Sequence, residues 1–118
     1  MRHGNHKYML KGSRSHRVAL MKNLCSEIID HGKIETTLTK ARAMKPFVEK
    51  LVTLAKNDTL ANRRLAYAKL NNKDAVKALF ENVAPKFKQR PGGYTRLLKL
   101  ADPRLGDAAD RAILAFVE

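Results

Sequence analysis

The spacing of hydrophobic residues predicts a helix in the first third of the chain. Four residues recur there at helical spacing and should face the core: Val18, Met21, Cys25 and Ile28. We expect Ser15 to be the N-cap, because a serine hydroxyl can accept a hydrogen bond from a free N–H of the first turn. Gly32 favours an end to the helix. The alternating, β-branched residues 33–37 then predict a short strand.

A second helix is predicted from about Leu38 to Asn57. Its apolar face is formed by Val48, Leu51, Val52 and Ala55. Pro46 lies inside this segment and has no N–H to donate to the preceding turn. We therefore expect a kink or a break at Pro46, with residues 38–45 forming a separately directed basic turn.

Two more helices should follow. Thr59 and Asn72 are typical N-cap residues, and they predict helices that end near Leu70 and Pro85. The apolar residues of these two helices that should contribute to the core are Leu65, Val76, Leu79, Phe80 and Val83.

The pattern changes after the fourth predicted helix. Residues 86–93 are typical of a loop, and residues 94–100 of a strand. Pro103 and Gly106 indicate a turn region. The apolar run at residues 112–117 is compatible with a strand. Because this run is apolar on both faces, we expect a central strand that is covered on both sides.

This order of elements is typical of an α+β domain. We expect a helix, a short strand, three helices and then a two-stranded C-terminal hairpin, which together form a small mixed sheet packed with helices. The 118 residues fit one domain. We place this domain at residues 15–118, after a basic, extended N-terminal arm at residues 1–14.

The charge of the chain indicates what it binds. Lys and Arg number 24 against 11 Asp and Glu, which gives a formal net charge of +13 and a pI of about 10.2. A small domain stays soluble with a net charge of about 2–8. The larger excess repels itself unless a polyanion neutralises it. Nucleic acid is the obvious polyanion.

The predicted arm has no acidic residue and no hydrophobic periodicity, so we expect it to order on a partner. The first acidic residue of the chain is Glu27. The candidate RNA-binding residues of the arm and of the first two helices are Arg2, His3, Lys7, Lys11, Arg14, His16, Arg17, Lys22 and Lys40.

Two further candidates are Arg63 and Arg64, near the start of the third predicted helix. Basic side chains at this end oppose the helix dipole, so a sequence optimised for stability alone would have acids there. The misfit favours a phosphate partner, which both the dipole and the guanidinium groups would attract. A face that is merely solvated is the alternative.

The loop before the hairpin is also basic. Gly92 and Gly93 would let the backbone approach a phosphate closely, although a turn before a strand is the ordinary interpretation of such a pair. Tyr94 could stack on an unpaired base or ribose, or it could be buried in the core. The basic residues around these three are Lys88, Arg90 and Arg96.

The C-terminal segment differs in charge from the rest of the chain. Residues 102–118 contain four acidic residues and two basic residues. We expect this segment to face away from RNA, towards water or a protein neighbour.

Catalytic and metal chemistry have little support. Cys25 is the single cysteine, which excludes an internal disulfide and a multi-cysteine zinc site. His3 and His6 with Cys25 match no ligand spacing. One rival remains a small nuclease or RNA-modifying enzyme that uses His16 or His31. The other rival is a DNA-architectural protein, which would bind duplex DNA as well as structured RNA.

The remaining expectations concern location and small ligands. No stretch reaches the roughly 18 apolar residues of a membrane span. The N-terminus lacks the apolar core of a signal peptide. A lone cysteine fits a reducing compartment. We expect a cytosolic protein with no membrane insertion, no cofactor and no small-molecule substrate.

Several segments, in order along nearly the whole chain, resemble the bacterial large-subunit ribosomal protein seventeen family. They are MRHG at residues 1–4, SHR at 15–17, IETTLTKA at 34–41, LVTLAK at 51–56, NRRLA at 62–66, LF at 79–80, RPGGYTRLLK at 90–99 and GDAA at 106–109.

The resemblance implies a role on the ribosome. Members of this family assemble onto large-subunit rRNA near the exit of the nascent-chain tunnel, where they contact rRNA and neighbouring ribosomal proteins. They have an α+β body and a basic N-terminal arm, and no enzymatic activity. We therefore expect a structural constituent of the large ribosomal subunit, in the bacterial cytoplasm, that binds rRNA and stabilises its fold.

Overall fold

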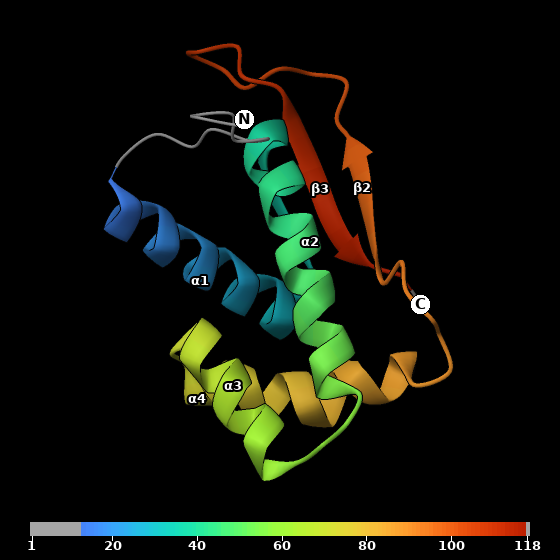
Figure 1. Cartoon of the computed structure of the whole chain (residues 1–118). Helices are drawn as coiled ribbons and strands as arrows, with labels where there is room; N and C mark the ends of the chain where they lie inside the picture. The colour runs from blue at the N-terminus through green and yellow to red at the C-terminus, as the bar shows by residue number, and fades with distance from the viewer. Residues whose placement is uncertain (1–12, 118) are drawn as a thin grey trace, which may run out of the picture.

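The computed structural model describes residues 13–117 (Figure 1). Residues 1–12 of the predicted arm lie outside them. Its last two residues do not belong to an arm, because Ser13 is the N-cap of α1 and Arg14 is the first residue of that helix. The elements in chain order are α1 (Arg14–His31), β1 (Lys33–Thr37), α2 (Leu38–Ala55), α3 (Leu60–Leu70), α4 (Lys73–Ala78), the π-helical turn η1 (Leu79–Val83), the 3-10 turn η2 (Ala84–Phe87), β2 (Thr95–Lys99) and β3 (Arg111–Phe116). The predicted α+β class is confirmed.

The three strands form one sheet in the order β1-β3-β2, and both pairings are antiparallel. The prediction of a mixed sheet is therefore wrong, because each neighbour of β3 runs opposite to it. The central place of β3 is confirmed, since Leu114 lies opposite both Ile34 and Leu97. The expected cover on both faces is wrong. Ala112 and Leu114 are fully buried, whereas Ile113 on the other face is only partly buried.

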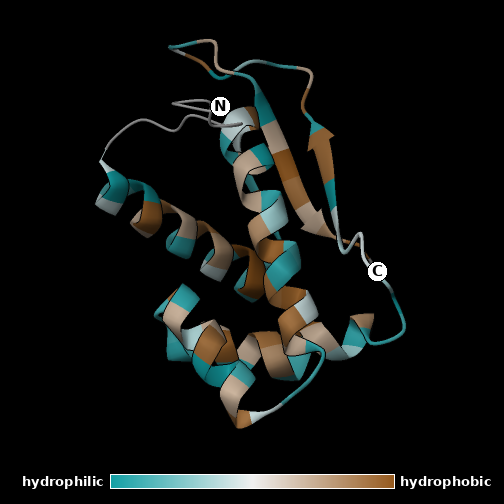
Figure 2. Cartoon of the chain, in the orientation of Figure 1, coloured by the Kyte–Doolittle hydropathy of each residue, from teal (hydrophilic) through white to brown (hydrophobic). Residues whose placement is uncertain are grey.

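The core lies around α2, which has the sheet on one side and α1 on the other (Figure 1). Figure 2 shows the hydrophobic stretches gathered where the end of α1 meets α2 and along β3. The side chains that fill this centre come from far-apart segments. Among the fully buried ones are Cys25, Ile28, Met44, Val48, Leu51, Leu79 and Leu114.

The start of α1 differs from the prediction. The N-cap is Ser13, whose hydroxyl accepts a hydrogen bond from the backbone N–H of His16 at 3.2 Å, so Ser15 is not the cap. Val18 is 46% exposed and does not enter the core. The buried residues of α1 begin at Cys25, because the first half of the helix extends past the elements that cover its second half. The predicted stop at Gly32 is confirmed by its left-handed backbone, with φ of 82°.

Helix α2 continues through Pro46 as one helix and ends at Ala55, so the predicted break is wrong. The proline removes the bond that the carbonyl of Arg42 would otherwise accept. Both Pro46 and Arg42 are exposed, which leaves that carbonyl on a side of the helix that water can reach. The loss of this hydrogen bond therefore destabilises the helix only a little. Burial of the apolar face of α2 stabilises the helix by more than that.

The next two helices begin as predicted, with the side chains of Thr59 and Asn72 accepting from the backbone N–H groups of Asn62 and Ala75. Leu65 is 53% exposed, so its predicted place in the core is wrong. The buried residues of α3 are Ala66 and Leu70. The other four predicted core residues of this region are buried: Val76, Leu79, Phe80 and Val83.

The predicted end near Pro85 is confirmed, although only Lys73–Ala78 is α-helical and the helical run continues through η1 and η2 to Phe87. Pro85 stands in the first turn of η2, where the change of helix type accommodates its missing N–H. The buried Phe87 ring holds this end, because it packs against the rings of Tyr94 at 5.3 Å and Phe116 at 5.8 Å between centroids. The predicted loop at residues 86–93 is correspondingly shorter.

Candidate nucleic-acid interface

The first half of α1 presents basic side chains to solvent. Its first turn contains no acidic residue. Arg14 and His16 are exposed, and Arg17 and Lys22 are partly buried. The positive end of the helix dipole and these cations have the same sign, so neither is compensated within this helix.

An open hollow of about 460 Å³ lies beside this basic surface. It is bounded by the first half of α1, by α2 and by the end of α3. We call it the basic-rimmed hollow. Its apolar lining is Val18, Met21, Phe47 and Ala68, and its charged lining is Arg14, Arg17, Lys22 and Lys69. The structure thus brings three predicted RNA-binding residues together with a lysine of α3.

The two arginines of α3 differ in their surroundings. Arg63 donates two hydrogen bonds to Asp58, from Nε at 2.6 Å and from Nη2 at 2.8 Å. Its guanidinium also lies 5.1 Å from the centroid of the Phe80 ring. This pairing lowers the pKa of Asp58 and raises that of Arg63. Arg64 is exposed and has no ion pair among residues 13–117.

The basic loop before β2 is held by its own backbone. The Nε of Arg90 donates to the carbonyl oxygens of Gly92 at 3.0 Å and Gly93 at 3.1 Å. Lys56 donates to the carbonyl oxygen of Arg90. Gly93 has φ of 62°, a conformation that other residues rarely adopt. The Nε–H of Arg90 therefore stabilises the turn, and the rest of its guanidinium remains to bind other groups.

Tyr94 is buried in the core, with 2% of its surface exposed. Its ring face is not available to a base, so the stacking role predicted for it is wrong and the core alternative holds. The phenol oxygen accepts from the Thr53 hydroxyl at 3.2 Å and from Lys56 Nζ at 3.1 Å. These hydrogen bonds, that of Thr53 first, lower the pKa of Tyr94.

The remaining predicted residues lie elsewhere on the surface. Lys88 is exposed and close enough to Asp58 to lower the pKa of that carboxyl further. Lys40 is in the first turn of α2, and Arg96 is exposed on β2 opposite Ala115. Neither lines the basic-rimmed hollow. The predicted residues Arg2, His3, Lys7 and Lys11 lie outside the described residues.

Comparison with known proteins identifies the family of this chain. The family model described as "Ribosomal protein L17" matches residues 20–117. The chain belongs to the ribosomal protein L17 family.

Relatives named "Large ribosomal subunit protein bL17" match over most of their length. That of Persephonella marina is 56% identical over 106 residues, which are 89% of this chain and 86% of that protein. The protein of Sulfurihydrogenibium sp. is 46% identical over 118 residues, covering 100% of this chain and 98% of its own. The protein of Flavobacterium psychrophilum is 48% identical over 118 residues, covering 100% of this chain and 72% of its own.

Ribosomal protein L17 is a structural component and not an enzyme, which confirms that prediction and leaves the nuclease rival without support. Burial raises the pKa of the Cys25 thiol to about 12, so the thiol stays protonated in the core. Within residues 13–117 no group of three or more His, Cys, Asp or Glu could hold a metal ion. None of the helices described there is long and apolar enough to cross a membrane.

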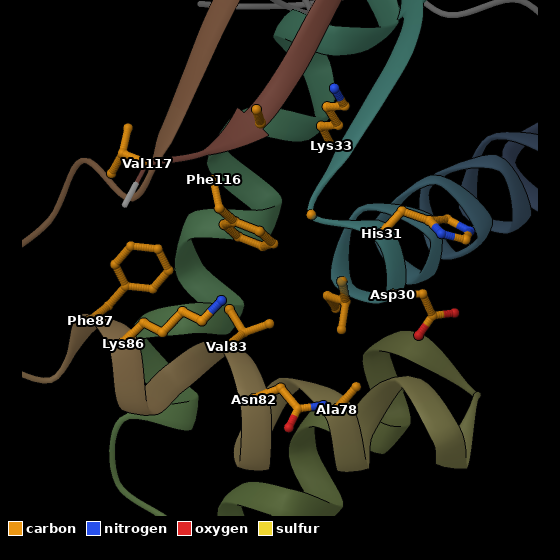
Figure 3. A pocket seen from close by; sticks show the side chains of 13 residues that line it. Asp30, His31, Lys33, Ala78, Asn82, Val83, Lys86, Phe87, Phe116 and Val117 are labelled. Carbon is orange, nitrogen blue, oxygen red and sulfur yellow. The ribbon is translucent and has the colours of Figure 1, made fainter.

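A second hollow, of about 650 Å³, lies where the end of α1 meets η1, η2 and the end of β3 (Figure 3). The rings of Phe87 and Phe116 lie on one side of it, with Asp30 and His31 across from them. In the described part of the chain, every buried side-chain nitrogen and oxygen has a hydrogen-bond partner. No buried polar group is therefore left over to bind a ligand in this hollow.

Sequence reasoning missed several residues of the interface. Lys69 and Phe47 line the basic-rimmed hollow although neither is near α1 in sequence. The signal for Lys69 was present, since residues 60–70 contain no acidic residue at all. Lys56 was also missed, and its role is to support the Arg90 turn and Tyr94.

Proposed function

We propose that the chain is a structural constituent of the large ribosomal subunit and binds large-subunit rRNA through the first half of α1 and through α3. The names of its relatives support the subunit. One observation supports this choice of binding surface. Arg14, Arg17 and Lys22 meet Lys69 of α3 around one hollow, and neither residues 14–26 nor residues 60–70 contain an acidic residue.

The electrostatics of these helices fit a phosphate backbone. The N-caps of α1, α2 and α3 are Ser13, Thr37 and Thr59, and none of their first turns contains an acidic residue. Phosphates near these cations would replace the missing negative charge. Each neutralised phosphate also releases counterions, which drives association at low salt. The arginines and lysines thus bind RNA by charge, and the shape of the folded body sets where it sits.

Residues 102–117 of the C-terminal segment should face away from this RNA. The two basic residues of this segment are already paired within the protein, Arg104 with Asp107 and Arg111 with Glu35. This edge of the molecule suits a neighbouring ribosomal protein. We place the protein in cytoplasmic ribosomes, near the exit of the nascent-chain tunnel, with residues 1–12 adding further phosphate contacts.

The salt dependence of binding tests this proposal. About eight phosphate contacts predict a slope of log affinity against log salt of roughly −6 to −7 for the full chain and large-subunit rRNA. Arg64→Gln should make the slope shallower by about one, because it removes an exposed cation of α3. Arg104→Gln is the matched control and should leave the slope unchanged, since Arg104 is already paired with Asp107. A wild-type slope shallower than about −2 would contradict the proposal.

Competition with duplex DNA separates this function from that of a DNA-architectural protein. A-form geometry and the 2′-hydroxyl distinguish RNA from DNA. Unlabelled duplex DNA should therefore displace labelled large-subunit rRNA far less effectively than unlabelled rRNA does. Equal displacement by both would favour the DNA-binding alternative.

A further inference from the structure

The basic-rimmed hollow combines two kinds of surface. Its floor is apolar, formed by Val18, Met21, Phe47 and Ala68. Four cations, and no acidic residue, complete its lining. Met21 and Phe47 pack against the edge of the core, and Val18 continues the apolar stripe of α1 beyond it. The hollow is thus an uncovered extension of the apolar surface, open to solvent and surrounded by positive charge.

Charge complementarity selects the occupant. An apolar protein segment would fill the floor but leave four cations unpaired unless it were also acidic. The chain's own residues 1–12 contain Arg2, Lys7, Lys11 and no acid, so the rim would repel them. A paired RNA stem would satisfy the cations and leave the floor empty. An unpaired nucleotide offers both parts, because its phosphates are anionic and its base is flat and largely apolar on its faces.

We propose that the basic-rimmed hollow holds a nucleobase turned out of its stack in the bound rRNA, with the flanking phosphates on Arg14, Arg17 and Lys22. The inference rests on the proposed rRNA binding and specifies the feature of the RNA that α1 recognises. The volume of about 460 Å³ lies within the range of about 300–1,000 Å³ that is usual for small-ligand sites.

Phe47 supplies the aromatic surface for the base. The ammonium of Lys69 lies 5.9 Å from the centroid of its ring. Lys69 carries its charge on a long, flexible chain, so the ammonium can move from the ring to a phosphate when a base arrives. The cation–π contact in the free protein therefore marks a ring face that a base can take over.

Filling the hollow tests the inference. Ala68 is exposed, so Ala68→Phe should place a ring in the hollow without disturbing the core. We expect the affinity of the full chain for large-subunit rRNA to fall about tenfold, the loss typical of one base–aromatic contact. The slope of affinity against salt should stay the same, because no cation is removed. Ala101→Phe, on the exposed connection between β2 and β3, is the matched control and should bind as the wild type does.

Ultraviolet cross-linking of the wild-type complex gives an independent result. Mass spectrometry should find a nucleotide on a peptide that contains Phe47 or Met21, and Ala68→Phe should abolish this adduct. If Ala68→Phe fails to fold, Val18→Asn gives a second test by making the floor of the hollow polar, and it should weaken rRNA binding and the adduct without unfolding the protein, since Val18 is already 46% exposed.

The outcomes separate this inference from the proposed function. Steep salt dependence in the wild type, with unchanged affinity in Ala68→Phe and no adduct at the hollow, would overturn the inference and leave rRNA binding intact. A wild-type chain that fails to bind large-subunit rRNA would overturn both.

Discussion

Arg63 and Arg64 are neighbours in sequence, yet their charges serve different ends. The sequence predicts one role for both, because they are adjacent arginines near the start of the same helix. The structure pairs Arg63 with Asp58 and places it over Phe80, so that much of its charge is used inside the protein. Arg64 is exposed without an ion pair in the described chain. This distinction depends on where Asp58 and Phe80 come to lie after folding.

Asp107 should make stability depend on acid. The hydrogen bond from Arg104 first, and that from the backbone N–H of Ala109 next, lower its pKa to about 2. An unfolded aspartate titrates near about 4, so the pair stabilises fully above that pH and its contribution is lost as the pH falls towards about 2. We expect Arg104→Gln to flatten the decline of the melting temperature in this window. The effect is small because solvent screens an exposed pair.

Asp107→Asn is the control for this effect, since it removes the titrating group and should flatten the same part of the curve. The melting temperatures are measured by circular dichroism as the pH is lowered. If they decline equally steeply in the wild type and in both variants, the Arg104–Asp107 pair does not contribute to stability.

At the scale of elements, local signals were predicted well and contacts between elements were not. Thr59, Asn72 and Gly32 were identified as helix ends because a cap depends on the adjacent backbone. The cap of α1 was placed two residues too late, at Ser15 in place of Ser13, because both serines are suitable cap residues. Val18 and Leu65 have the right spacing but are exposed, since burial depends on which part of a helix another element covers. The break predicted at Pro46 is wrong for a similar reason. The proline removes one hydrogen bond of the helix, but burial of the apolar face of α2 stabilises the helix by more than this loss.

The central strand should be highly sensitive to substitution on one face. Leu114 is fully buried and lies opposite Ile34 and Leu97. Leu114→Asp should unfold the protein, because a buried carboxylate without a partner costs several kcal/mol. Ile113→Asp is the matched control, on the partly buried face of the same strand, and should retain the fold with a lower melting temperature. An unchanged thermal transition in Leu114→Asp would mean that this face is not part of the core.

For the whole molecule, charge and family resemblance predicted the function, and the assembled surface required the structure. The net charge of +13 identified a polyanion partner without placing it. The basic-rimmed hollow joins α1, α2 and α3, so Phe47 and Lys69 could be found only once those helices were packed together. Tyr94 shows the reverse case. Its place in a basic loop favoured RNA, but its ring fills the space next to Phe87.

Removing the predicted arm should separate folding from binding. The core is built from residues that begin at Cys25, so deletion of residues 1–12 should leave the melting temperature nearly unchanged. Affinity for large-subunit rRNA should fall, and the salt slope should become shallower by about two to three as three cations are lost. A collapse of the thermal transition would instead mean that residues 1–12 contribute to the core.

The most direct test of rRNA binding in the large subunit is sedimentation of cell extracts in a moderate-salt gradient. The account predicts that the native protein travels quantitatively with large ribosomal subunits, and that it is released as the salt concentration is raised. Native protein that stays with the free proteins at the top of the gradient, at low and moderate salt alike, would contradict the account.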